Sequence, residues 1–569
     1  MMRSFKVLLK LGLLIAANVT ILHAQSLRTS SGNLPNIVFI MADDLGWKEL
    51  GCYGNDFNET PNLDVLASKS KKFSQAYAAA PVCSPTRASI MTGQYPARVG
   101  ITDFLPEGWK TERFLDPDLY VTLNEALAER GYHTGIVGKW HLDTRFKRHT
   151  GSPQAHGFHE VIGSETEYIA GGDYFYPYSK ISTYTKGSSD EYLTDRQSRD
   201  ACDFIKNNKE KPFFLYLSYY SVHTRLAAPK HTVEKYKAKF DKKYGKGKAD
   251  QIFEKNPQHE ADHLDNPYLA AMLEHIDHGV GMLMQTLDEL GLSENTIIVF
   301  TSDNGGAISV ANNGNLRAHK TWIYEGGIRI PLLFHWPKQI KAGEITEPVS
   351  SIDYYPTFVA ATGGDVSTYK VDGENLLPLL TKGSALRRKE LYWHNPVETL
   401  KPTEKMATAV RQGNYKLIKF YLDNRYELYD LQKDPFEIMN IANENPEKVK
   451  ELDALMEKWK AEVKAEEPDA EAISKARSLP ASQAKQRTDD LKQELGLSDD
   501  QYKNMYAMFL AFFNRNEEIR KIQMTPEEKK WALEENNKQR HQRLMQIITP
   551  VQLEKLKEVW KRGAAETKK

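Results

Sequence analysis

The chain has 569 residues, too many for one small domain, and this length predicts roughly two to four folded units. Hydrophobic residues make up 40% of the chain, which is enough for a sizeable core. Lysine plus arginine and aspartate plus glutamate both total 76, so no bulk charge is available to attract nucleic acid or an anionic membrane surface.

The first 24 residues are typical of a secretory signal peptide. Arg3 and Lys6 precede an apolar run, VLLKLGLLIAANVTIL, and Ala24 in LHAQS offers a cleavage position. The run is too short and too interrupted for a stable membrane span, although an N-terminal anchor helix is the alternative interpretation. We therefore expect an exported protein, periplasmic or secreted. Three cysteines are no disulfide framework, so we expect Cys52 and Cys202 to be free and buried, although an oxidising compartment would allow them to pair.

The segment that follows predicts an α/β domain. Continuous apolar runs, as expected of strands that are covered on both faces, begin in PNIVFIMADD, HTGIVGKW, KPFFLYLSYYSVH and NTIIVFTSDNGG. Helical stretches lie between them, in TPNLDVLASKSKKF and VTLNEALAERGY. Strands that alternate with helices favour a large, mostly parallel sheet flanked by helices. Ligands of such sheets bind at the carboxyl ends of the strands.

Past residue 400 the pattern changes. GNYKLIKFYLDNRYELYDLQKDPFE predicts two or three short antiparallel strands, and a helix follows from about residue 446 to 464, giving a small α+β subdomain. A polar linker leads to a charged, glycine-poor helical tail, in which LSDDQ, MTPEE and ITPVQ supply helix-start residues. The predicted units are a signal peptide over 1–24, a catalytic α/β domain over 35–395, an α+β subdomain over 396–466, a linker over 467–490 and a helical tail over 491–569.

Two acidic pairs end two of the predicted strands. Asp43 and Asp44 follow the first strand, and Asp303 and Asn304 follow a later one. Adjacent aspartates at a strand end repel each other unless a cation lies between them, and an all-oxygen ligand set suits Ca²⁺ or Mg²⁺ rather than zinc. Each pair alone is better explained as a helix or turn cap. The two pairs together favour a metal site.

Basic residues lie beside other strand ends and loops. They are Arg87, Lys139, His141, His223 and Lys320. A lone histidine is usually structural and a lone lysine is usually solvated, but grouped around a divalent cation these residues would form a pocket for a tetrahedral oxyanion. That grouping predicts chemistry on a sulfate or phosphate ester. Cys83 heads a loop of small residues in PVCSPTRASIMTG, and it is either an inert buried thiol or chemical starting material.

Several motifs occur in the order seen in type I sulfatases. They are PNIVFIMADDLGWKELGCYGN, TPNLDVLA, PVCSPTRASIMTGQYPARVGI, GYHTGIVGKWHL, TSDNGG, YEGGIRIPLLFHWP and YELYDLQKDPFEIMNIA. The chain resembles this family over roughly residues 35 to 465. The most specific part is CSPTR, because C-x-P-x-R marks the cysteine that a maturation enzyme converts to Cα-formylglycine (3-oxoalanine). Thr86 stands where serine is commonest. The resemblance implies an alkaline-phosphatase-like fold.

The resemblance also implies a nucleophile and a metal ion. Hydrated formylglycine at position 83 would be a geminal diol, one hydroxyl of which attacks the sulfur of a sulfate ester. One calcium ion would be held by the formylglycine oxygen of Cys83 together with Asp43, Asp44, Asp303 and Asn304. Asp303 is in addition a candidate to deprotonate the attacking hydroxyl.

The basic residues match further roles in that family. His223 and Lys320 match groups near the leaving oxygen, with His223 as the candidate general acid. Lys139 matches a lysine that binds sulfate. His141 would take the proton from the second hydroxyl, so that sulfate is expelled and the aldehyde returns. Arg87 would hold the formylglycine loop and offset its charge.

The function implied by the resemblance is hydrolysis of sulfate esters. The substrate we expect is a sulfated polysaccharide or oligosaccharide, and the other expected partner is the maturation enzyme; we expect neither nucleic acid nor a membrane span. Residues 103–116, 164–190 and 392–396 are candidates for the substrate pocket. One alternative is a phosphonate or phosphodiester hydrolase of the same superfamily. The other is a binding protein that acts through its helical tail, in which LSDDQ and its repeats resemble the LTxxQ motif of Spy-type periplasmic proteins.

Overall fold

The computed structural model describes residues 34–566, except 106–112, 145–149, 165–173, 179–180, 182, 259–264, 309, 397–404 and 479–481. The predicted signal peptide therefore lies outside the described residues. Cys52, Cys83 and Cys202 are all free thiols, and Cys52 is only partly buried. Within the described part of the chain, no helix combines the length and the apolarity that crossing a membrane requires.

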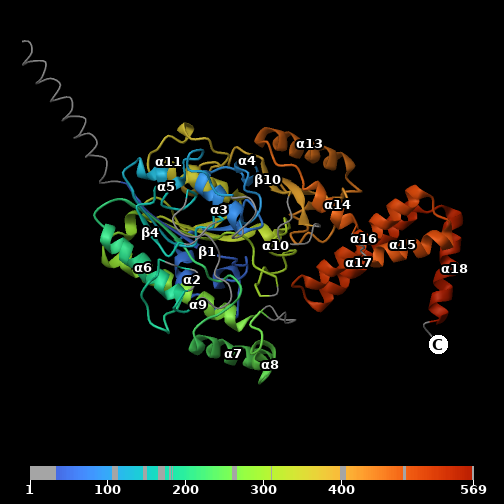
Figure 1. Ribbon diagram of the computed structural model, residues 1–569, viewed down its shortest axis with the longest axis horizontal. Coiled ribbons are helices and arrows are strands. Elements are labelled where there is room, and N and C mark those ends of the chain that lie inside the picture. The colour runs from blue at the N-terminus through green and yellow to red at the C-terminus, as the bar shows by residue number, and fades with distance from the viewer. Residues whose placement is uncertain are drawn as a thin grey trace, which may run out of the picture.

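A mixed, mostly parallel sheet forms the centre of the molecule (Figure 1). Its strands lie side by side in the order β4 (Glu160–Ile162), β3 (His133–Gly138), β5 (Phe213–Ser218), β1 (Asn36–Ala42), β6 (Thr296–Ser302), β7 (Arg329–His335), β2 (Lys71–Tyr77) and β8 (Gly343–Ile345), with β9 (Val349–Ser350) also paired to β2. Among the described strands of this sheet, β7 alone runs antiparallel to its neighbours. Every residue of β1, β5 and β6 is buried, which explains their unbroken apolar sequences.

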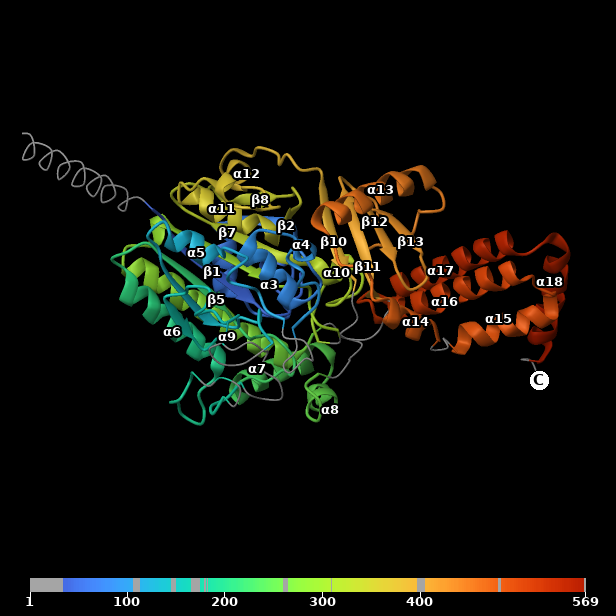
Figure 2. The ribbon, with the colours of Figure 1, turned by 45° about the horizontal axis from the view of Figure 1, so that its top comes forward.

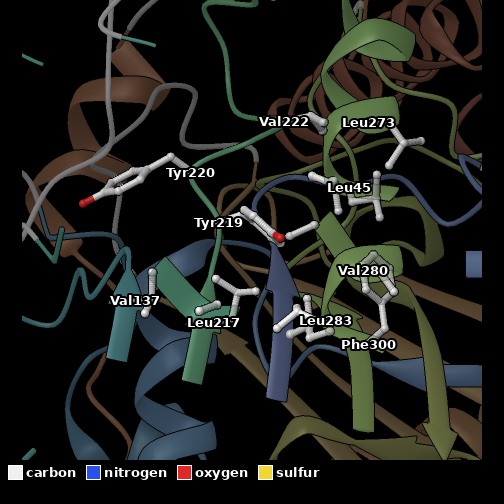
Figure 3. Packing of buried hydrophobic residues seen from close by; sticks show 14 of the residues in the cluster. Leu45, Val137, Leu217, Tyr219, Tyr220, Val222, Leu273, Val280, Leu283 and Phe300 are labelled. Carbon is white, nitrogen blue, oxygen red and sulfur yellow. The ribbon is translucent and has the colours of Figure 1, made fainter. Parts of the chain in front are cut away.

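Two layers of helices cover the sheet. One layer contains α2 (Pro61–Ser68), α6 (Leu193–Asn208) and α9 (Pro267–Glu289), and the other contains α3 (Cys83–Thr92), α5 (Leu123–Ala128) and α11 (Tyr354–Ala361). Successive side chains of β1 point to opposite faces of the sheet. Val38 and Ile40 pack in the core under the first layer, and Ile37 and Phe39 pack in the core under the second. Figure 3 shows part of the first core around α9.

Further helices complete this part of the chain. They are the helices α4 (Pro96–Val99), α7 (Lys230–Tyr244), α8 (Lys248–Phe253), α10 (Glu325–Ile328) and α12 (Leu377–Lys382), and the 3-10 helices η2 (Gly51–Tyr53), η3 (Ser293–Asn295), η4 (Ser351–Asp353) and η5 (Val366–Thr368). The sequence CSPTR was expected to be a loop, but it forms the first turn of α3. Proline is well tolerated there, because the first turn of a helix has no intrahelical acceptor for its N–H groups.

A second, antiparallel sheet confirms the predicted change of architecture. It contains β10 (Glu390–Asn395), β11 (Ala407–Gln412), β12 (Tyr415–Phe420) and β13 (Tyr426–Asp430), and α13 (Pro446–Val463) packs on it. The sheet thus begins at Glu390, ahead of the boundary expected at 396. Trp393 of β10 explains this position. Its indole donates a hydrogen bond to the Ala78 carbonyl (2.8 Å), and its ring lies edge-on to Tyr77, so β10 belongs to both units.

The tail is helical from an earlier point than expected. Helices α14 (Ala470–Ser478) and α15 (Ser482–Leu495) occupy much of the segment predicted to be a linker, and α16 (Asp499–Lys521), α17 (Pro526–Ile547) and α18 (Pro550–Glu566) follow. Capping boxes at Ser498 and Thr525 start α16 and α17, as the sequence predicted. Residues such as Met505, Leu544 and Leu556 form a separate core. Figure 2 shows the tail projecting from the side of the molecule that carries the antiparallel sheet.

Candidate active site

The register of the central sheet brings the predicted site together. Ala42 at the end of β1 lies opposite Ser302 of β6, and Gly138 of β3 lies opposite Ser218 of β5, which is the next strand on the other side of β1. Since these parallel strands end at the same level, the residues that follow them meet at one edge. Asp43 and Asp44, Lys139, and Asp303 and Asn304 therefore emerge side by side.

The acidic residues form a compact, fully buried group. Carboxylate oxygens of Asp43, Asp44 and Asp303 lie within 4.8 Å of one another. The backbone N–H of Asp44 donates to Asp303 Oδ1 (3.1 Å), and Asn304 Nδ2 donates to Asp44 Oδ1 (2.8 Å). Asp44 has a φ of 60°, in the left-handed region that is uncommon for residues other than glycine and that clusters at functional sites.

This group fits a hard divalent cation. Asp43 Oδ1 and Asn304 Oδ1 are buried acceptors without a hydrogen-bond donor, which is costly unless something else satisfies them. Burial raises the pKa of Asp43 to about 7, against the pull of Lys139 and with a further push from Asp303. A cation among the oxygens would relieve both the crowding of like charges and the missing donors. The all-oxygen set suits Ca²⁺ or Mg²⁺.

Arg87 links the acidic group to α3. Its guanidinium is completely buried, and Nε and Nη2 both donate to Asp303 Oδ2, at 3.0 and 2.7 Å. Nη1 donates to Ser218 Oγ (2.6 Å) and to the Lys139 carbonyl (3.0 Å). Burial opposes the charge of this side chain, but Asp303, Asp43 and other neighbouring groups together raise its pKa. Because Cys83 lies one turn earlier on α3, Arg87 fixes position 83 relative to the acidic group.

Position 83 faces a neutral imidazole. Cys83 Sγ lies 3.2 Å from His141 Nδ1, and His141 Nε2 lies 3.0 Å from the Leu105 carbonyl. A carbonyl only accepts, so Nε2 carries the proton and Nδ1 is free to act as an acceptor toward position 83. Burial, together with the charges of Lys139 and Arg87, holds the pKa of His141 well below its usual value. Burial raises the pKa of the Cys83 thiol, so this sulfur is no activated thiolate.

Three basic groups face the acidic cluster from other sides. Lys139 Nζ donates to Asp43 Oδ2 (2.7 Å), and Lys320 Nζ donates to Asp44 Oδ2 (2.8 Å). Lys320 Nζ is also 3.2 Å from His223 Nε2. Burial lowers the pKa of His223 to about 3, and the charge of Lys320 adds to this effect. In contrast, Asp44 raises the pKa of Lys320 despite burial. The imidazole is therefore neutral and the ammonium charged.

All of the site residues predicted from the sequence lie in this one cluster: Asp43, Asp44, Cys83, Arg87, Lys139, His141, His223, Asp303, Asn304 and Lys320. Two contributors were missed. Ser218 accepts from Arg87, and its place at the end of β5 was a usable signal. The Tyr174 hydroxyl lies 2.9 Å from the carbonyls of both Tyr220 and His223, and it holds the segment of His223. Nothing in the sequence pattern singled out Tyr174.

Two family models match the sequence. The model described as "Sulfatase" matches residues 35–364, and the model described as "N-sulphoglucosamine sulphohydrolase, C-terminal" matches residues 317–466. Residues after 466 lie outside both matches.

Several similar proteins match this chain over most of their own length. A protein named "Sulfatase" from Formosa agariphila is 29% identical, over 78% of this chain and 90% of its own, and arylsulfatase A from Homo sapiens is 31% identical, over 74% and 87%. The crystal structure of "Ps i-CgsB in complex with k-i-k-neocarrahexaose" has a TM-score of 0.65 and is 30% identical, over 79% of this chain and 99% of its own. A structure of "BT4656 in complex with its substrate D-Glucosamine-2-N, 6-O-disulfate" has a TM-score of 0.61 and is 26% identical, over 77% and 99%.

Proposed function

The chain belongs to the sulfatase family, and from this premise we propose that it removes sulfate from sulfated carbohydrates, with Cys83 converted to Cα-formylglycine and one calcium ion bound beside it. Hydrolysis of sulfate esters follows from the family itself. The finer parts of the proposal rest on one observation above all. Cys83 Sγ lies 3.2 Å from a neutral imidazole nitrogen, and Arg87, one turn later on the same helix, binds Asp303 of the buried, oxygen-rich acidic group.

The environment of Cys83 supports its conversion. The thiol is 2% exposed and its pKa is raised by burial, so cysteine itself would be a poor nucleophile here. When formed, a hydrated aldehyde at position 83 supplies one hydroxyl to attack sulfur and a second to release the sulfate. His141 Nδ1 is the acceptor within reach of position 83, and its hydrogen bond through Nε2 to the Leu105 carbonyl keeps that nitrogen unprotonated.

Asp43, Asp44, Asp303 and Asn304 would hold the calcium ion. When bound, the ion supplies Lewis-acid polarisation and neutralises charge on sulfate oxygens. Arg87 keeps Asp303 in place through two hydrogen bonds to one oxygen. Lys139 and Lys320, which donate to Asp43 and Asp44, extend the positive side of the pocket toward an anionic ester.

The leaving oxygen needs a proton, and the pair of His223 and Lys320 can supply it. Lys320 Nζ donates toward His223 Nε2 at 3.2 Å, and the depressed pKa of His223 places the proton on the lysine in the resting site. We propose that the pair acts as one general acid, in which Lys320 holds the proton and His223 orients or relays it. Tyr174 keeps the His223 backbone in position.

A carbohydrate substrate is supported by two solved structures of similar chains. One is named as a complex with a neocarrahexaose and the other as a complex with a disulfated glucosamine substrate. We propose a sulfated oligosaccharide or polysaccharide for this chain on that basis, together with export of the chain after cleavage behind Ala24. N-terminal sequencing of protein from its own host tests the cleavage, and an N-terminus that retains residues 1–24 would contradict it.

The deciding experiment combines mass spectrometry with paired substrates. We expect the peptide that contains residue 83 to carry the aldehyde, and sulfated oligosaccharides to be hydrolysed in preference to phosphodiesters of matched structure. Cys83→Ala should abolish turnover and keep the circular dichroism spectrum. A fully alkylatable thiol at position 83 in active enzyme would refute the formylglycine mechanism. A strong preference for phosphodiesters would favour the phosphonate or phosphodiester hydrolase alternative.

A further inference from the structure

The turn between α16 and α17, residues 522–525, reaches the segment that carries Lys320. We propose that this turn and the end of α16 form a clamp on residues 310–321, so that the tail is a positioning part of the catalytic unit rather than an independent module. We call residues 310–321 the Lys320 segment. The inference depends on the sulfatase proposal only for its kinetic readout.

The first contact of the clamp lies beside the loops that follow Asp44 and Asn304. Gln523 Nε2 donates to the Ala311 carbonyl (2.9 Å). The Ala311 side chain packs against Gly306 so closely that no larger residue would fit at position 306. A Cβ built on Gly306 would lie 2.3 Å from the Ala311 Cβ and 3.0 Å from the Gly46 Cα. Gly46 and Gly306 each lie two residues after a proposed calcium ligand, namely Asp44 and Asn304. A shift of Ala311 would therefore press on both acidic loops or release them.

The second contact is a buried ion pair. Arg317 is completely buried, and its guanidinium binds Glu518 of α16 as well as Glu427 of β13 (3.1 Å) and the Glu437 carbonyl (3.0 Å). Arg515 of α16 supports Glu518 at 3.1 Å. Removing one partner of a buried charge is far more harmful than losing an exposed pair, because the remaining charge stays out of water. The tail thus completes the environment of Arg317, three residues before Lys320.

The backbone around Lys320 needs such support. Ala318 and Thr321 have φ values of 60° and 81°, and for a β-branched residue like Thr321 a positive φ is a clear outlier. Conformations of this kind persist only where the surroundings impose them. Two hydrogen bonds then tie the segment to the site, from Lys320 N to the Gly306 carbonyl (3.0 Å) and from Thr321 N to the Pro81 carbonyl (2.7 Å), close to Cys83.

The test compares two glutamine variants of the full-length mature enzyme. Gln523→Met keeps the length of the side chain and removes the donor, while Gln546→Met makes the same change at an exposed position about 30 Å farther along α17. We expect Gln523→Met to speed hydrogen–deuterium exchange in peptides that span 310–321. We also expect it to lower kcat on 4-nitrophenyl sulfate roughly fivefold with little change in KM, since one hydrogen bond is lost. Gln546→Met should change neither.

A donor of similar reach should restore the clamp, so we expect Gln523→Lys to recover most of both losses. Glu518→Gln, which weakens the Arg317 contact, should act like Gln523→Met. Unchanged exchange over 310–321 in both Gln523→Met and Glu518→Gln would overturn the proposal, and so would faster exchange with an unaltered kcat. If the wild-type enzyme hydrolysed no sulfate ester, the proposed function would fail, while the exchange measurement would still decide whether the clamp exists.

Discussion

Two of the buried charged clusters in the described part of this molecule differ in how their carboxylates are arranged. In the active-site cluster, oxygens of three aspartates lie within 4.8 Å of one another, and Asp43 Oδ1 and Asn304 Oδ1 have no hydrogen-bond donor. In the second cluster, between α10 and the antiparallel sheet, opposite charges alternate. Lys416 lies 3.0 Å from Glu325 and 2.8 Å from Glu437, and Tyr77 donates to Glu325.

The pKa values alone do not separate the two clusters. Burial raises the pKa of Asp43 to about 7, and burial raises that of Glu437 to about 7 as well. The number of converging carboxylates does separate them. Oxygens of three aspartates lie within 4.8 Å of one another in the first cluster, whereas a single lysine, Lys416, bridges two glutamates in the second. Three converging carboxylates mark a place for a divalent cation, and two carboxylates bridged by a lysine mark a structural joint. This contrast makes different predictions for the two regions.

Metal removal gives the largest expected effect. The chelator should act through the active-site cluster and leave the cluster around Lys416 unchanged. We expect a calcium chelator to lower turnover on the order of a hundredfold or more, because the Lewis-acid contribution to sulfate binding and reaction is lost. The melting temperature should fall at the same time, since a ligand that binds only the native state stabilises it. An activity assay with and without chelator measures turnover, and scanning calorimetry under the same two conditions measures the melting temperature. In Asp303→Asn, which should bind the ion poorly, the chelator should no longer shift the melting temperature. An equal shift in that variant would argue against this metal site.

The second cluster should respond in stability and not in turnover. Lys416→Met leaves Glu325 and Glu437 buried without their common cation, and we expect it to lower the free energy of unfolding by about 3–5 kcal/mol. Urea denaturation measures this change. Activity per folded molecule should stay near that of the wild type. A loss of turnover much greater than the loss of folded protein would show that the two clusters are coupled after all.

The antiparallel sheet should also make the protein sensitive to acid. Burial lowers the pKa of His394 to about 4, from a usual value of 6.5, and its Nε2 donates to the Glu466 carbonyl. As the pH falls, His394 is protonated in the unfolded chain before it is protonated in the folded chain. The stability that the neutral, buried His394 contributes is therefore complete above pH 6.5 and is lost as the pH falls toward 4. The full contribution is about 3 kcal/mol. Melting temperatures between pH 4 and 7 should show this slope, and His394→Gln should flatten it. An unchanged slope in that variant would assign the acid sensitivity to other groups.

The smallest expected effect concerns the active site again. Tyr174→Phe removes the hydroxyl that holds the His223 segment, and we expect kcat to fall roughly fivefold through the loss of about 1 kcal/mol of positioning. Steady-state kinetics on 4-nitrophenyl sulfate measures it. Tyr176→Phe provides a matched control, because the Tyr176 hydroxyl bonds to the Thr185 carbonyl and is exposed. Equal kinetics for the two variants would remove Tyr174 from the site.

The sequence predicted the parts of the site that follow strands. Asp43 and Asp303 could be paired because an apolar run precedes each, and parallel strands end at a common edge. Three features were out of reach for physical reasons. The helical start at Cys83, the inclusion of Trp393 in the second sheet and the contact of Gln523 with Ala311 all depend on packing against residues distant in the sequence, which leaves no local pattern.

The order of the strands along the chain determines the order in which the parts of the site can assemble. β1 contributes Asp44 early in the chain, but its neighbour β6 brings Asp303 only 259 positions later. Until then the edge of β1 that pairs with β6 stays open, although β5 can already pair with the other edge. Such non-local pairing is slow and exposes apolar surface. The clamp adds a final step, since Gln523 is made after every other part of the site. A chain released from the ribosome too early would carry all of the proposed catalytic groups and still lack the residue that steadies them.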